Sequence, residues 1–349
     1  MSKEVKNSIV RIATLSAVFF FCYIATAAAA ETSATGTNIF APQSTPARSI
    51  LHLSLFVLSI TGLIFVVVVT LIIVSISKFR ATSANAHSEP AQVYGSTQIE
   101  LAWTIIPVLI VIVLFLATAR VIHAIQDAPE PPGAVEVTVI GHQYWWEFRY
   151  PKLGIVTANE LHIPVSDPTH PTPTFLRLLS ADTDHSFWVP ELAGKTDLIP
   201  NHPNRMWMDP QRTGVFLGQC AQYCGTQHGK MLLRVSVDSQ QDFAAWVRSQ
   251  QQPAVQDASA AAGRQIFEHT ACINCHTVSG TAADGRFGPD LTHLMSRATI
   301  AAGAAENTPQ NLRLWIEDPN AIKPGSLMPA MKLSDANLDE VVKYMETLH

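Results

Sequence analysis

The stretch Gly218-Gln-Cys-Ala-Gln-Tyr-Cys-Gly-Thr-Gln-His-Gly-Lys-Met231 brings together the residue types that decide the fold of the middle of this chain. Cys220, Cys224, His228 and Met231 supply thiolate, imidazole and thioether, which suit copper, whereas zinc has little use for a thioether. The second cysteine allows a two-copper site with bridging thiolates. A disulfide between the two cysteines is the alternative, since exported chains commonly use cysteines in this way.

A second cysteine pair lies in Cys272-Ile-Asn-Cys-His276, the attachment signature of haem c. In this motif the thiols of Cys272 and Cys275 add to the haem vinyl groups, and His276 is placed to bind the iron as proximal ligand. A redox-active dithiol is the alternative interpretation. The position of the motif, just after an expected helix, favours covalent haem.

The composition limits the class of protein. The 349 residues include 23 Lys and Arg against 28 Asp and Glu, giving a net charge of −5, and only 15% are charged, against roughly 25% in soluble domains. The apolar excess lies in the first third of the chain. These values exclude a wholly soluble protein and a polytopic transporter, and they give no basic footprint for nucleic acid.

The N-terminus has the pattern of an export signal. Lys3, Lys6 and Arg11 precede an apolar run that ends in Ala28-Ala-Ala30, and this order predicts a signal peptide over 1–30. A retained first membrane helix is the alternative, because the run is long for a signal.

Two further apolar runs predict a membrane hairpin over 31–126. The helices are expected at about 50–77 and 101–125, near or above the roughly 20 residues that span a bilayer. Lys78 and Arg80 follow the first run, which places the connection in the cytoplasm. Everything after the hairpin is then expected on the outer side of a cell membrane, periplasmic or extracellular.

Three segments follow the hairpin. Short β-branched and aromatic runs separated by turn residues predict an all-β module over 134–249. Residues 250–262 are polar and small, typical of a linker, and helical patterns predict an all-α module over 263–349. A flexible linker of this length has an r.m.s. span of roughly 20 Å, so electron transfer between the modules is expected to be intramolecular.

The last module resembles class I cytochromes c. Gly263-x-x-x-Phe267 matches their first helix, Gly288-Pro-Asp-Leu291 the loop that supports the proximal histidine, and Tyr344 the aromatic residue of the closing helix.

The same resemblance implies the second iron ligand. Lys323-Pro-Gly-Ser-Leu-Met-Pro329 is similar to the family's loop that presents a methionine to the iron. The match implies Met328, and Met331 is the competitor. A thioether ligand raises the reduction potential of the iron, which suits electron transfer.

The β module resembles the copper A domain of cytochrome c oxidase subunit II, a cupredoxin barrel. The matching stretches are Gly141-His-Gln143, His185-Ser-Phe-Trp-Val-Pro-Glu-Leu-Ala-Gly-Lys-Thr-Asp-Leu-Ile-Pro200 and Gly218-Gln-Cys-Ala-Gln-Tyr-Cys-Gly225. The resemblance implies two copper ions held by His185, Cys220, the main-chain carbonyl of Gln222, Cys224, His228 and Met231.

Two positions depart from that family's pattern. The family has Glu where this chain has Gln222, and that Glu side chain also serves a magnesium site shared with subunit I. The family's aromatic residue after His-Gln is usually Trp, the residue through which electrons enter. Here it is Tyr144, followed by Trp145 and Trp146, so we place the entrance for electrons in this aromatic region.

Glu100 begins Glu100-Leu-Ala-Trp-Thr-Ile-Ile-Pro107, which is similar to the start of the family's second helix. The resemblance implies that Glu100 stands at the mouth of a proton path into subunit I. Taken alone, the residue is better interpreted as a carboxylate at the membrane interface, and it is the resemblance that favours the proton path.

These observations indicate a subunit II of a caa-type haem-copper oxidase, through which electrons pass from haem c to copper A. The expected partners are subunits I and III, other oxidase subunits, the membrane, and a cytochrome c or bc complex as donor. Oxygen reduction, coupled to proton translocation, is expected in subunit I. A membrane-anchored electron shuttle for another reductase, such as a copper A nitric oxide reductase, is the alternative. Copper storage does not explain the haem.

Overall fold

The computed structural model describes most of the chain after the expected export signal. The signal, 1–30, and most of the loop between the two apolar runs lie outside the described residues. The described residues are 37–80, 89, 92, 94–167, 169, 171–255 and 257–349.

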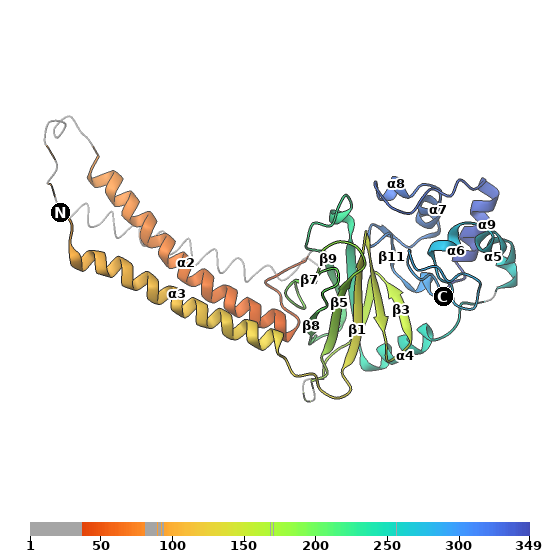
Figure 1. Cartoon of the computed structure of the whole chain (residues 1–349), viewed down its shortest axis with the longest axis horizontal. Coiled ribbons are helices and arrows are strands. Elements are labelled where there is room, and N and C mark those ends of the chain that lie inside the picture. Colours follow the sequence, from red (N-terminus) through yellow and green to blue (C-terminus); the bar gives the residue numbers. More distant parts are fainter. Residues whose placement is uncertain are drawn as a thin grey trace. The chain divides into compact units, whose positions relative to one another are not determined.

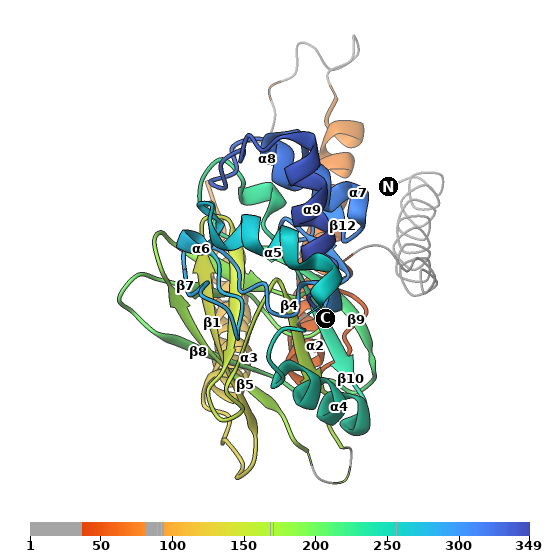
Figure 2. The same cartoon turned by 90° about the vertical axis from the view of Figure 1, so that its right-hand side faces the viewer.

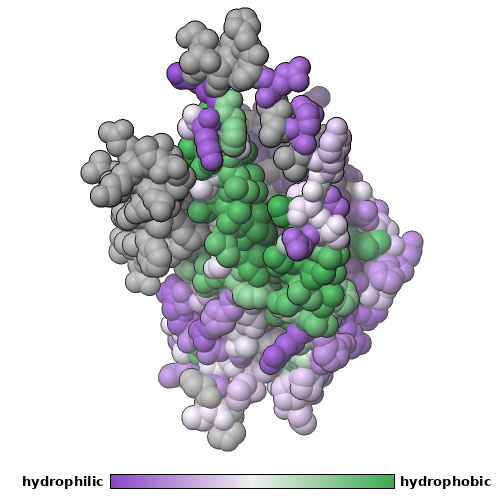
Figure 3. All heavy atoms as spheres, turned by 90° about the vertical axis from the view of Figure 1, so that its left-hand side faces the viewer, coloured by the Kyte–Doolittle hydropathy of each residue, from purple (hydrophilic) through white to green (hydrophobic). Residues whose placement is uncertain are grey.

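The two apolar runs form long helices, α2 (Thr45–Lys78) and α3 (Thr97–Gln126). Both extend a few residues beyond the expected 50–77 and 101–125, because polar residues that flank the apolar runs continue the helical hydrogen bonding. None of the side chains in their most apolar windows is buried within the chain. Figure 3 shows this apolar surface in green. Such a surface requires a nonpolar environment, which a bilayer supplies.

The β module consists of two five-stranded sheets (Figure 1). The first has the order β3-β2-β1-β5-β8, and the second β4-β10-β9-β6-β7. The strands are β1 (Val135–His142), β2 (Trp145–Tyr150), β3 (Ile155–Ala158), β4 (Glu160–Pro164), β5 (Thr174–Ser180), β6 (His185–Trp188), β7 (Thr196–Leu198), β8 (Asn204–Met208), β9 (Gly214–Cys220) and β10 (Leu232–Asp238). The predicted all-β architecture is confirmed.

Alternation of side chains along the strands builds the core of this module. In β10, Leu233, Val235 and Val237 are buried while the residues between them are half-buried, as expected when successive side chains point to opposite faces. Phe148 and Phe187 meet edge to face from the two sheets at 6.4 Å between ring centroids. The core therefore fixes the ends of β6 and β9 relative to each other.

Helix α4 (Gln240–Gln250) closes the β module after β10. The hydroxyl of Ser239 accepts a hydrogen bond from the backbone N–H of Asp242, which caps the first turn. Trp246, on the inner face of this helix, stacks on His162 of β4 at 4.6 Å.

The last module is mainly helical, as predicted. Its helices are α5 (Ala261–Glu268), α6 (Cys272–Cys275), α7 (Pro309–Glu317), α8 (Pro319–Ile322) and α9 (Asp335–Met345), with a pair of two-residue strands, β11 (Thr299–Ile300) and β12 (Ala305–Glu306). Figure 2 shows α5, α7 and α9 together. Phe267 of α5 and Tyr344 of α9 are buried against each other, with ring centroids 5.7 Å apart.

The connection between the two modules is more ordered than the expected flexible linker 250–262. Ala254 and Ala260 are buried. A short 3-10 helix, η2 (Ala258–Ala260), leads directly into α5, which begins at Ala261. Small alanine side chains pack readily against the helical core, so this segment does not behave as a free polar tether.

The crossing of α5 and α9 gives a test of the helical core. A Cβ added at Gly263 would lie 1.8 Å from the carbonyl oxygen of Glu340. We therefore expect Gly263→Ala to destabilise this module by about 1–3 kcal/mol, the usual cost of overpacking.

Thermal unfolding followed by haem absorbance measures that loss. Gln265→Ala, at an exposed position of the same helix, is the matched control and should stay within about 0.5 kcal/mol. Equal stability of Gly263→Ala and the parent chain would contradict the observed packing.

Candidate copper and haem sites

Five side chains predicted as copper ligands converge at one end of the β sandwich. Cys220 ends β9, and its Sγ lies 3.9 Å from Nδ1 of His185, the first residue of β6, and 3.8 Å from Sγ of Cys224. Sγ of Cys224 lies 3.8 Å from Nδ1 of His228 and 3.9 Å from Sδ of Met231. The ligand atoms of His185, Cys220 and Cys224 all lie within 4.8 Å of one another, and these residues are buried.

The two sulfur atoms are too far apart for a disulfide, which requires about 2.05 Å. Both cysteines are free. Their mutual hydrogen bond lowers the pKa of Cys220 to about 3 and raises the pKa of Cys224 above its usual range. Cys220 is therefore the more readily deprotonated of the two cysteines, and two buried cysteine sulfurs beside two imidazoles and a thioether fit copper.

A carboxylate orients the first histidine of this cluster. Nε2–H of His185 donates to Oδ1 of Asp182 at 2.8 Å, so Nδ1 is free to face Cys220. Burial lowers the pKa of His185, but the hydrogen bonds to Asp182 and Cys220 outweigh it and leave the pKa raised. A carboxylate that holds the remote ring nitrogen in this way is a recurring feature of metal-binding histidines.

The carbonyl of Gln222 also reaches the cluster. Its main-chain oxygen lies 3.1 Å from Sγ of Cys220, while its side chain is exposed. The backbone therefore presents the oxygen regardless of which side chain occupies this position.

The aromatic region 144–146 connects β1 to β2 beside these ligands. Trp146 is fully buried, its ring centroid lies 6.0 Å from that of His185, and its Nε1–H donates to the carbonyl of Met231 at 3.4 Å. The hydroxyl of Tyr144 accepts the backbone N–H of Thr226 at 3.2 Å.

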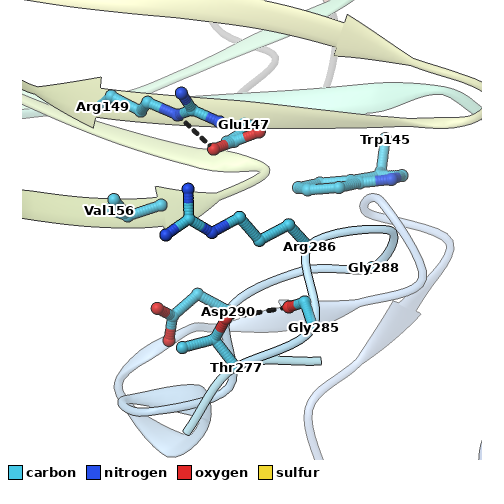
Figure 4. Close-up of a pocket in the computed structure, with 9 residues that line it drawn as sticks. All are labelled: Trp145, Glu147, Arg149, Val156, Thr277, Gly285, Arg286, Gly288 and Asp290. Atoms are coloured by element: carbon cyan, nitrogen blue, oxygen red, sulfur yellow. Dashed lines mark hydrogen bonds and ion pairs between the residues drawn. The ribbon is translucent and has the colours of Figure 1, made fainter. Parts of the chain in front are cut away.

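Trp145, next to Trp146 in β2, makes contacts outside the copper ligands. Its ring stacks on His142 with centroids 4.3 Å apart. It also lines a cavity of about 230 Å³ between β2, β3 and the loop 285–290. Figure 4 shows the Arg286 side chain extending into this cavity below Glu147, and the ring of Trp145 at its edge.

A larger cavity, of about 470 Å³, lies mainly in the cytochrome module and is also lined by residues of the copper module. All four residues predicted to hold haem line it, and so does the competing methionine: Cys272, Cys275, His276, Met328 and Met331. The cavity brings together sequence positions that are more than fifty residues apart, and its lining is mostly apolar, as a macrocycle requires.

The histidine of the haem motif is held in a binding-competent form. Nδ1–H of His276 donates to the carbonyl of Pro289 at 2.7 Å, so Nε2 is free to face the cavity. A Cβ at Gly288 would lie 2.6 Å from Cε1 of His276, so only glycine leaves room for the ring. Burial lowers the pKa of His276, which favours the neutral imidazole that binds iron.

Sequence reasoning missed Arg297, which also lines this cavity. Its side chain is buried, its Nη2 donates to the carbonyl of Asp290 at 2.6 Å, and its Nε has no partner among the described residues. A buried guanidinium with an unpaired N–H fits a carboxylate group of a haem. No local motif marks a single arginine, so the sequence offered no signal for it.

Glu100 lies in the first turn of α3, in the hairpin. Its side chain is exposed within the chain, and neither ligand cluster includes it.

Comparisons with known proteins agree with this organisation. The family described as "Cytochrome C oxidase subunit II, transmembrane domain" matches residues 32–121, and its periplasmic domain matches residues 135–238. The family described as "Cytochrome c" matches residues 260–349. These matches imply a membrane anchor, a copper A site and a haem c.

Similar full-length proteins are named cytochrome c oxidase subunit 2. The protein of Alkalihalophilus pseudofirmus is 33% identical over 83% of this chain and 84% of its own length, and that of Bacillus sp. strain PS3 is 34% identical over 77% and 80%. The solved periplasmic domain of cytochrome oxidase subunit II of Bradyrhizobium japonicum is 26% identical over 35% of this chain and 96% of its own, with a TM-score of 0.32. The chain belongs to the cytochrome c oxidase subunit II family, the subunit at which electrons enter a haem-copper oxidase, and it carries a cytochrome c domain after its copper domain.

Proposed function

We propose that this chain accepts electrons at its cytochrome module, transfers them to its copper module, and delivers them to the oxygen-reducing subunit I. One observation carries the proposal. Gln143 and Tyr144 line the haem cavity, and Nε2 of the same Gln143 donates to the carbonyl of Cys224 at 2.6 Å. A single segment therefore joins the two ligand sets within one compact unit of the chain. When bound, haem c and the copper pair each supply a one-electron redox centre.

The proposed copper ligands are those that converge on the two buried cysteine sulfurs. Cys220 and Cys224 would hold the copper ions through their sulfur atoms, and the other donors would be Nδ1 of His185, Nδ1 of His228, the thioether of Met231 and the carbonyl of Gln222. The donor set combines soft sulfur with imidazole, as copper prefers, and Asp182 fixes the ring of His185.

The proposed haem ligands come from two loops. Cys272 and Cys275 would hold the macrocycle covalently, and Nε2 of His276 and the thioether of Met328 would bind the iron. Arg297 pairs with a haem carboxylate, since its Nε is buried and unpaired in the part of the chain that the structure describes.

Electrons are proposed to cross the segment Tyr144, Trp145 and Trp146. Tyr144 and Trp145 line the haem cavity, and Trp146 packs against His185 and Met231. The segment therefore offers a continuous path of covalent bonds and aromatic contacts.

The hairpin is proposed to sit in the inner or plasma membrane, with both redox modules on the extracytoplasmic side, because Lys78 and Arg80 follow the first helix. Glu100, at the start of α3, is proposed to stand at the mouth of a proton path into subunit I. Subunit III and a cytochrome c or bc complex complete the proposed partners.

The choice of iron ligand is open to a direct test. Both methionines line the haem cavity, but only Met328 follows the Pro324-Gly325 turn. We expect Met328→Ala to abolish the near-infrared Met–Fe(III) band. Met331→Ala, the matched control, should keep it. The reverse result would show that Met331 is the ligand.

The copper assignment predicts a spectrum of the copper-loaded chain. Two coppers that share one unpaired electron give a seven-line hyperfine pattern in electron paramagnetic resonance. Cys224→Ser should lose the pattern because one bridge is removed. A four-line, single-copper spectrum from the parent chain would contradict the copper A assignment.

The Gln222 position yields a third prediction. Because only its main-chain carbonyl lies at the cluster, Gln222→Glu should keep the seven-line pattern. A new negative charge beside the coppers favours their oxidised form, so the reduction potential should fall, and manganese binding in the assembled oxidase should strengthen.

A redox titration measures this effect. Gln241→Glu adds the same charge at an exposed position of α4 and should leave the potential of the copper site nearly unchanged. An equal fall in both variants would show that the effect is not local to the cluster.

A further inference from the structure

A buried carboxylate of the copper module is bonded entirely to the cytochrome module. Glu160, the first residue of β4, is 7% exposed. Its carboxylate accepts the backbone N–H groups of Ala298 and Thr299 at 3.0 and 2.9 Å and the hydroxyl of Thr299 at 2.7 Å. Among the described residues, these are all of the hydrogen bonds that the carboxylate makes. The copper module thus inserts a charge into a set of donors that the other module provides.

A buried lysine of the cytochrome module bonds to the copper module in the opposite direction. Lys323, on the loop that leads to Met328, is 3% exposed. Its Nζ donates to the carbonyl of Tyr144 at 2.7 Å and to that of Ala301, in its own module, at 3.3 Å. The loop that bears the proposed iron ligand is therefore attached to the first residue of the proposed electron path.

Backbone and apolar contacts accompany these two side chains in the surface between the modules. The backbone N–H of Leu232 in β10 donates to the carbonyl of Ala302 at 3.1 Å. Trp145 and Ala158 of the copper module and Ala302 of the cytochrome module form a buried apolar cluster. The interface thus combines a backbone hydrogen bond, apolar contact and the hydrogen bonds of two buried ionisable side chains.

We propose that Glu160 and Lys323 form a reciprocal latch, which holds the cytochrome module in the position from which it transfers electrons to the copper module. All the hydrogen-bond partners of the Glu160 carboxylate and the shorter hydrogen bond of the Lys323 amine lie in the other module, so separating the modules breaks hydrogen bonds of both buried groups. Both are proposed as positioning residues: neither is one of the proposed copper or iron ligands, although Lys323 lines the haem cavity. The inference rests on the proposed function and adds that the haem domain is docked rather than loosely tethered.

Hydrogen exchange of the haem- and copper-loaded chain tests the latch. The amide of Leu232 reports separation of the modules, because its acceptor lies in the cytochrome module and it does not contact Glu160. Glu160→Gln should accelerate its exchange roughly tenfold to a hundredfold, the range implied by the loss of a charge-assisted hydrogen bond. Lys323→Met should act in the same direction.

Two control variants remove charges elsewhere. The Asp238 carboxylate accepts Nδ1–H of His162 within the copper module, and Lys343 is exposed on α9. Asp238→Asn and Lys343→Met should leave the exchange at Leu232 unchanged. Unaltered copper and haem spectra in the latch variants would show that each module is still folded. Unchanged exchange at Leu232 in both latch variants, or equal acceleration in the controls, would overturn the proposal.

Electron transfer after flash photoreduction of the haem gives a second readout. In the parent chain the rate should not depend on protein concentration, and Glu160→Gln should slow it or add a slower phase. Hydrogen exchange needs no electron transfer. A chain that shows the latch by exchange but no transfer between the modules would therefore retain the latch and lose the proposed electron route.

Discussion

The hydrogen bond from Nε2 of Gln143 to the carbonyl of Cys224 links the wall of the haem cavity to the loop that holds the copper ligands. At 2.6 Å it holds the connection between β1 and β2 against the cysteine loop. The aromatic residues that follow Gln143 then lie between the two redox sites. Electron transfer needs a fixed, short separation, and this bond is one of the contacts that fix it.

The same kind of hydrogen bond orients the proposed metal-binding histidine in each module. Asp182 binds Nε2–H of His185, and the carbonyl of Pro289 binds Nδ1–H of His276. In both cases an acceptor in the protein holds the proton of the nitrogen that does not bind metal. The ring is thereby oriented before the metal arrives, and little reorganisation is needed when its oxidation state changes.

The contact between the modules decides what is gained by joining a cytochrome module to the copper module in one chain. A flexible linker would raise the local concentration of a cytochrome but leave it to find its docking position. Here the connecting segment is partly helical, and Glu160 and Lys323 are buried in the contact. A fixed arrangement removes the search step, and the cytochrome then acts as a built-in first redox site of the subunit.

The local motifs could be predicted from the sequence because their chemistry is set by spacing along the chain. Each of these motifs lies within one short segment of the chain. They are the two cysteines and the histidine of Cys272–His276, the donors of Cys220–Met231, and the two long apolar runs. The all-β and helical modules followed from residue patterns of the same short range, and the family resemblance supplied His185 and the Gln222 carbonyl.

The tertiary structure alone decided which distant residues meet. His185 of β6 lies beside the cysteines at the end of β9. Arg297, which belongs to no sequence motif, lines the haem cavity. Glu160 accepts hydrogen bonds from amides more than a hundred residues further along the chain. None of these contacts has a local pattern, because each depends on how sheets and helices pack. A lone arginine or glutamate looks like a solvated surface residue until folding buries it, so burial and long-range pairing gave these residues their roles.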